Sequence, residues 1–188
     1  MKMLSKFGVL LLVGSIGFMS SCKDDDKDDD MTPAPEPTLY EKVGGTEMVS
    51  DPANAGAMIE KGRLSFRAVV DSTIFVIAGD PALQPYFPVL LGEVQNGDLS
   101  GFAVLSKNLT DFFSVAAGAE NYTYSGMNMV DAHDPSKNSR MAMKSDDAAF
   151  DAFVADVVTG AQQNNVPNEI IGEVGELLET LRGDIVQK

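Results

Sequence analysis

The chain has 188 residues, with 28 acidic and 14 basic side chains, one histidine and one cysteine, and its formal net charge is −14. Nucleic acids and anionic membrane surfaces repel such a chain, so neither is expected as a partner. The sequence also contains no Ser-His-Asp set, no cluster of metal ligands and no phosphate-binding loop.

Residues 1–21 have the pattern of a secretion signal. Lys2 and Lys6 precede the apolar run 7–19, which is too short and too rich in Gly and Ser for a membrane-spanning helix. The run ends in FMSSC, which resembles a lipobox, so Cys22 is expected to be lipidated and to become the first residue. Removing 1–21 takes away two lysines and no acids, so the charge changes from −14 to −16.

Residues 22–38 are expected to form a tether. The acidic run KDDDKDDD at 23–30 predicts a solvated segment, and three prolines in 31–37 predict a stiff extended spacer. An acidic run directly after a lipobox also resembles the export signal of Bacteroidetes surface lipoproteins; a tag remnant is the alternative. We therefore expect a membrane-anchored lipoprotein at the cell surface or on the periplasm-facing outer membrane, with residues 39–188 as its one domain.

The first half of this domain contains one clear helix. Residues 39–45 (LYEKVGG) predict a short helical turn stopped by two glycines. Residues 50–62 are expected to be a loop with a helical turn at 57–61. In 64–78 the apolar residues recur three and four apart, which predicts a helix, although the β-branched content also permits a buried strand. A corner at 80–87 and a loop at 88–100 are expected to follow.

The second half is predicted to contain three further helices. Apolar residues at helical spacing mark 102–116, 150–161 and 170–185. Residues 145–147 (SDD) are expected to cap the second of these, with the acids at its positive end, and Asn168 the third. Residues 134–144 are polar and are expected to be a loop, so the predicted fold class is all-α.

The only histidine lies in the segment 124–133, YSGMNMVDAH. Gly126 breaks the chain before a short helical turn, and Met129 and His133, four residues apart, would share one face of that turn. Neutral imidazole is the commonest metal ligand and the usual proximal ligand of haem in oxygen carriers. A solvated loop histidine is equally compatible with this segment alone.

The segment resembles the proximal region of group I truncated haemoglobins. Tyr124, Gly126, Met129 and His133 match a tyrosine, a glycine two residues later, a methionine three further and a haem-ligating histidine four after that. The Leu-Tyr and Gly-Gly of 39–45, the Asp-Pro-Ala-Leu-Gln-Pro-Tyr-Phe corner at 80–87 and the last two helices resemble the same family. The resemblance covers most of 39–186, interrupted by three length changes, and implies a two-over-two helical sandwich with haem b between its layers.

The resemblance also implies the site residues. His133 would ligate the iron, with Met129, Phe87, Phe150 and Phe153 lining the ring. The family's hydrogen-bonding tyrosine and glutamine correspond here to Ile74 and Leu109, and the nearby distal position is Leu105; all three are apolar. Thr73 and Asn108 are adjacent and would serve if the register shifts by one residue.

The implied function is reversible binding of a diatomic gas, namely oxygen, CO or NO, at haem iron. Losing a donor to bound oxygen costs about 1–3 kcal/mol, or roughly tenfold to more than a hundredfold in affinity. The family's nitric-oxide dioxygenation needs a stable oxygenated state, so the apolar distal residues argue against it. A haem-capture or haem-storage surface lipoprotein and a haem-free helical binding module are the alternatives.

Overall fold

The computed structural model describes residues 35–188, of which 36–188 form one compact unit. The predicted signal at 1–21, Cys22 and the acidic run lie outside the described residues. Within the described part, no helix combines the length and the apolar character needed to cross a bilayer.

The domain begins with a short helix and a β-hairpin. Helix α1 (Leu39–Lys42) starts with a capping box between Thr38 and Glu41. Strands β1 (Met48–Ser50) and β2 (Met58–Glu60) pair antiparallel, with Val49 opposite Ile59. The predicted helical turn at 57–61 is therefore wrong, because pairing with β1 holds these residues extended until the next helix begins.

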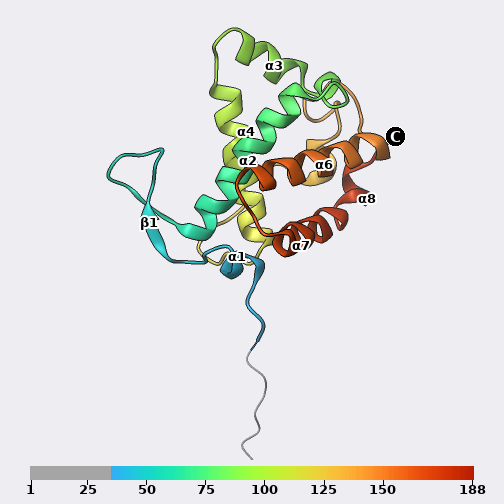
Figure 1. The fold of residues 1–188 in the computed structure, drawn as a ribbon. Coiled ribbons are helices and arrows are strands. Elements are labelled where there is room, and N and C mark those ends of the chain that lie inside the picture. Colours follow the sequence, from blue (N-terminus) through green and yellow to red (C-terminus); the bar gives the residue numbers. More distant parts are fainter. Residues whose placement is uncertain (1–34) are drawn as a thin grey trace, which may run out of the picture. The chain divides into compact units, whose positions relative to one another are not determined.

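Four long helices form the two layers of the domain (Figure 1). Helix α2 (Lys61–Gly79) packs against both α4 (Ser100–Ala116) and α6 (Asp147–Gln163). Helix α7 (Asn168–Glu179) packs against α6. The structure thus confirms the predicted all-α, two-over-two architecture, and it confirms helix rather than strand for 64–78.

A further helix lies where a loop was expected. After a 3-10 turn at Gln84–Tyr86, helix α3 (Pro88–Gln95) follows directly and packs against α4. The loop prediction for 88–100 is wrong over 88–95, because Gly92 lies inside this helix and does not break the chain. At the first helical position proline loses no hydrogen bond, and Leu90 of this helix is buried in the core.

The C-terminal part differs from its prediction in two details. Asp146 caps α6 as expected, but Asn168 is the first residue of α7, and no side chain caps that helix. The last apolar run is also divided, into α7 and α8 (Arg182–Ile185). The Thr180 hydroxyl donates to the Leu177 carbonyl at 2.6 Å, a local bond that competes with the helical pattern where α7 ends.

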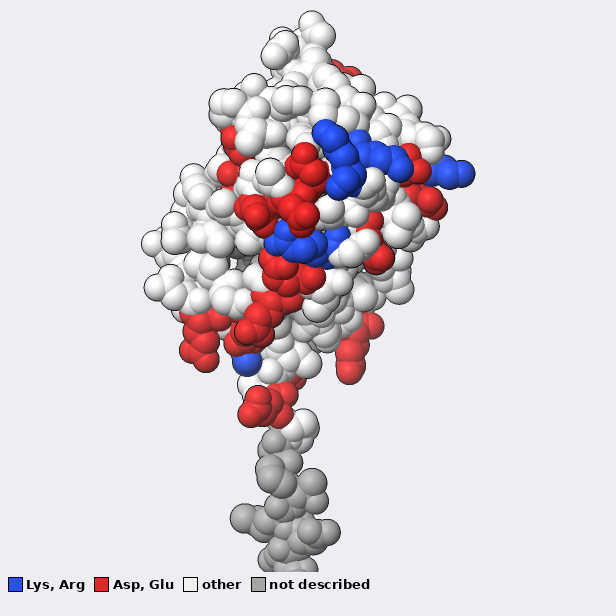
Figure 2. All heavy atoms as spheres, turned by 90° about the vertical axis from the view of Figure 1, so that its right-hand side faces the viewer, with Lys and Arg blue, Asp and Glu red and all other residues white. Residues whose placement is uncertain are grey.

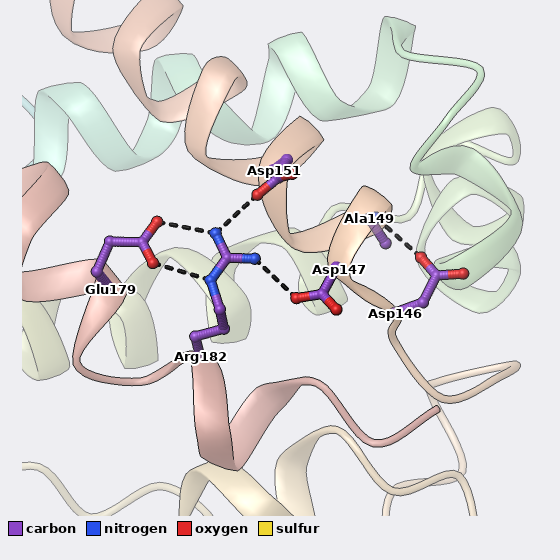
Figure 3. A network of polar contacts seen from close by, with 6 residues as sticks. All are labelled: Asp146, Asp147, Ala149, Asp151, Glu179 and Arg182. Atoms are coloured by element: carbon purple, nitrogen blue, oxygen red, sulfur yellow. Dashed lines mark hydrogen bonds and ion pairs between the residues drawn. The ribbon is translucent and has the colours of Figure 1, made fainter.

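Arg182 joins the three C-terminal helices (Figure 3). Its guanidinium donates to Glu179 of α7 and to Asp147 and Asp151 of α6, at distances between 2.7 and 3.0 Å. It also lies 4.2 Å from the centroid of the buried Phe150 ring. Figure 2 shows one face of the molecule, on which several acidic side chains lie next to basic ones.

Candidate functional site

The lone histidine sits at the end of a short capped helix. Asn128 caps α5 (Met129–Ala132) by accepting a hydrogen bond from the Asp131 amide at 2.8 Å, and His133 follows as the C-cap. The Nδ1 atom of His133 lies 2.8 Å from the Met129 carbonyl oxygen. Because a carbonyl only accepts, Nδ1 carries the proton, which leaves the lone pair on Nε2.

Burial keeps this imidazole neutral. Desolvation lowers the pKa of His133 below its ordinary value, and the bond to the Met129 carbonyl opposes that shift only in part. At neutral pH the side chain is therefore an unprotonated base, which is the form that binds a metal.

His133 lines two adjoining cavities beside α4. Helix α6 lies across the inner cavity from α4, and α5 with the loop residues 138–141 borders the outer one. The inner cavity has a volume of about 120 Å³ and the outer one about 350 Å³. Both are lined by Phe87, Leu105, Leu109, Phe112, Met129, His133 and Met141. We call the two together the crevice.

The inner cavity of the crevice is apolar and the outer one has a polar rim. Phe150 and Phe153 of α6 line only the inner cavity, where Ile77 of α2 joins them. The polar side chains of the outer cavity are those of Tyr124, Asn108, Asn138 and Arg140. The crevice thus offers a deep apolar slot that opens toward hydrogen-bonding groups.

The structure brings together seven of the eight residues proposed for the cofactor. Phe87, Leu105, Leu109, Met129, His133, Phe150 and Phe153 all line the crevice. Ile74 does not: it is buried in a smaller cavity of about 40 Å³ beside Phe102, and it is Ile77, three residues further along α2, that lines the crevice.

Asn108 and Thr73, the two polar alternatives for the distal positions, lie in different places. Asn108 lines the outer cavity on the α4 side. Thr73 instead lies against α6, where its hydroxyl oxygen has no hydrogen-bond partner among residues 35–188. Asn108 is therefore the polar side chain that α4 presents to the crevice.

Sequence reasoning missed Arg140 and Met141 as lining residues. Both belong to the loop 134–144, whose path over the crevice has no periodic pattern that a sequence reveals. Met141 is buried beside Tyr86, whose carbonyl accepts a hydrogen bond from the Ala142 amide at 3.2 Å. Only the apolar run 141–143 near the end of an otherwise polar segment hinted at this contact.

The fold and the crevice define the class of the protein: it has the two-over-two fold of a truncated globin. No family model matches the chain. A group 1 truncated haemoglobin of Tetrahymena thermophila is 24% identical over 153 residues, which cover 81% of this chain and 98% of that protein.

Solved structures agree on the fold. Three crystal structures of mutants of the truncated haemoglobin from Tetrahymena pyriformis, all in the Fe(III) form, superpose with TM-scores of 0.55, 0.54 and 0.53. They are 22%, 22% and 23% identical to this chain, and each alignment covers 81% of it and the whole of the other protein. These findings confirm the resemblance to group 1 truncated haemoglobins and the fold class predicted from the sequence.

Proposed function

We propose that the domain binds haem b in the crevice, where Nε2 of His133 would ligate the iron, and that the protein in this form binds a diatomic gas reversibly. The observation that carries this proposal is the bond from His133 Nδ1 to the Met129 carbonyl. It fixes the tautomer, orients the ring beside the crevice and leaves Nε2 free to ligate.

The residues of the crevice suit haem chemically. The aromatic walls of Phe87, Phe112 and Phe150 match a flat apolar ring, and Met129 supplies a soft side chain next to the ligand. The polar rim suits the two carboxylates of haem, which stay close to water. When bound, the haem supplies the iron that takes up the gas; the protein sets its axial ligand, polarity and access.

The wall facing His133 bears on the choice of gas. Leu105 and Leu109 offer van der Waals contact but no hydrogen-bond donor, whereas bound oxygen is stabilised by a donor. We therefore propose weak oxygen affinity with fast oxygen release, and comparatively strong binding of CO, which depends less on such a bond. An Asn108 amide that reaches the bound gas would supply the missing donor and raise the oxygen affinity.

The test is haem titration of the full chain and of His133→Gly. The unmodified chain should develop a sharp Soret band with one haem per chain. The variant should lose the band or hold haem loosely, and millimolar imidazole should restore it by filling the space of the missing side chain. A Soret band of unchanged position and intensity in the variant, indifferent to imidazole, would show that His133 is not the ligand.

Haem capture or storage is the second candidate function. The apolar side chains of Leu105 and Leu109 in the α4 wall favour it, because a storage protein needs tight haem binding and no donor to a gas. Transfer of haem to a scavenger protein, measured with and without CO, distinguishes the two. A haem that binds neither CO nor oxygen but transfers readily would support capture and refute the gas-binding proposal.

We also propose that the protein is a lipoprotein anchored through Cys22 at the cell surface or on the periplasm-facing outer membrane. The support is the FMSSC sequence followed by the acidic tether. Cys22→Ser should release the protein from membrane fractions or trap its precursor. Unchanged processing and attachment would refute the anchor, and protease treatment of intact cells then separates surface display from a periplasmic position.

A further inference from the structure

An ion pair lies at the rim of the outer cavity. Arg140, in the loop after α5, binds Glu93 of α3 through both nitrogens of its fork, with Nη1–Oε1 at 2.9 Å and Nη2–Oε2 at 2.5 Å. The hydrogen bonds from Arg140 lower the pKa of Glu93, so both groups are charged at neutral pH. Among the described residues that line the crevice, Arg140 is the only cation.

A glycine makes room for this pair. Gly101 lies in the first turn of α4 and also lines the outer cavity. A Cβ atom placed on Gly101 would overlap both Glu93 Oε2 and Arg140 Nη2. Any other residue at this position would push the paired side chains off α4, although alanine is the better helix former.

The loop that carries Arg140 is also fixed on the histidine side of the crevice. Asn138 donates through Nδ2 to the carbonyl of Ala132, the last residue of α5, at 2.8 Å, and its Oδ1 accepts from the Arg140 amide at 3.1 Å. The ion pair then joins the same loop to α3, which packs against α4. The loop therefore spans from the histidine side of the crevice to the opposite wall.

We propose that this strap, Asn138 to Arg140 closed by the Arg140–Glu93 pair over Gly101, is a gate that haem must open to enter or leave the crevice. The inference rests on the proposed haem binding and adds a kinetic device to it. A gate lowers the rates of haem entry and exit together, because the same pair must break in both directions. It leaves the equilibrium affinity nearly unchanged.

The first test is stopped-flow haem uptake by the haem-free full chain, paired with haem loss to an excess of scavenger protein. Gly101→Ala, Glu93→Gln and Arg140→Gln should each raise both rates by about two- to fivefold, the range expected for a partly exposed ion pair. The side chains of Arg140 and Glu93 are 44% and 24% exposed, so high salt should raise the wild-type rates as well.

Two matched controls separate the gate from general loosening. Lys42→Gln removes a comparable ion pair, Lys42–Glu173 at 2.9 Å, which lines neither cavity. Gly172→Ala makes the same glycine-to-alanine change in a helix where a Cβ meets nothing within 4 Å. Neither should change the two haem rates.

A second readout needs no haem. Hydrogen exchange of the Ala142 amide, which donates to the Tyr86 carbonyl beside the strap, should accelerate in the three gate variants and not in the two controls. Unaccelerated exchange in all three would show that the pair does not hold the loop, and would overturn the proposal.

The haem rates also distinguish a gate from an alternative role of Arg140. If Glu93→Gln slows haem loss while Arg140→Gln speeds it, Arg140 is an anchor for a haem carboxylate that Glu93 competes for, and the gate is refuted. Unchanged rates in all three variants, with an intact Soret band, refute the gate alone. A wild-type chain that forms no Soret band refutes the proposed function instead, before any rate is compared.

Discussion

The crossing of α2 and α6 allows a sharp test of the packing that holds the crevice in shape. Gly160 of α6 lies directly against Thr73 of α2. A Cβ atom at Gly160 would lie 2.9 Å from the Thr73 backbone nitrogen and 3.1 Å from its Cα, and it would overlap the hydroxyl. Backbone atoms do not swing aside as a flexible side chain does, so Gly160→Ala must move one helix relative to the other.

The magnitude follows from two opposing contributions. Overpacking of a buried contact costs about 1–3 kcal/mol, and replacing glycine by alanine inside a helix regains about 0.5–1 kcal/mol. Because the contact involves the backbone, we expect a net loss of about 1–2 kcal/mol in the free energy of unfolding. For a domain of this size that lowers the melting temperature by roughly 2–8 °C.

Gly172→Ala is the matched control for this prediction. The same substitution at this exposed position of α7 meets no neighbour, so it should stabilise the domain by about 0.5–1 kcal/mol. Urea unfolding followed by circular dichroism measures both variants against the unmodified chain. If Gly160→Ala stabilises the protein as much as Gly172→Ala does, the close approach of α2 and α6 is wrong.

Further predictions concern a buried acid, a buried hydrogen bond and the gas. Burial raises the pKa of the Asp156 carboxyl, so the folded state loses stability as the pH rises through that raised pKa. Asp156→Asn should therefore unfold at a higher urea concentration than the unmodified chain at pH 7, and this gain should vanish toward pH 3. A gain that does not depend on pH would contradict the prediction. Tyr40 donates a hydrogen bond to the buried Glu60 carboxylate at 2.7 Å, so Tyr40→Phe should lower the free energy of unfolding in urea by about 1.5–3 kcal/mol. A decrease below about 0.5 kcal/mol, the size expected for a surface change, would show that the bond is dispensable. With haem bound, Leu109→Gln should slow oxygen release by about tenfold or more in stopped-flow measurements. Ile74→Tyr should slow it less, because Ile74 lies outside the crevice. The reverse order of the two rates would place Ile74 beside the gas.

The four long helices and the histidine segment could be predicted from the sequence because their signals are local. Apolar side chains three and four residues apart must face one direction in a helix, whatever else the chain does. The spacing from Met129 to His133 is likewise a property of one helical turn, and the structure places both in the crevice. The resemblance to truncated haemoglobins rested on the same short-range spacings.

Only the tertiary structure decided the elements whose stability depends on distant partners. Met58–Glu60 became a strand because β1 offered a pairing edge, and 88–95 became a helix because α4 buries Leu90. Ile74 and Ile77 lie one turn apart on the same helix, and the sequence cannot say which of them meets α4 across the crevice. The Arg140–Glu93 pair joins residues 47 positions apart, and it exists only because Gly101 leaves space between their two elements.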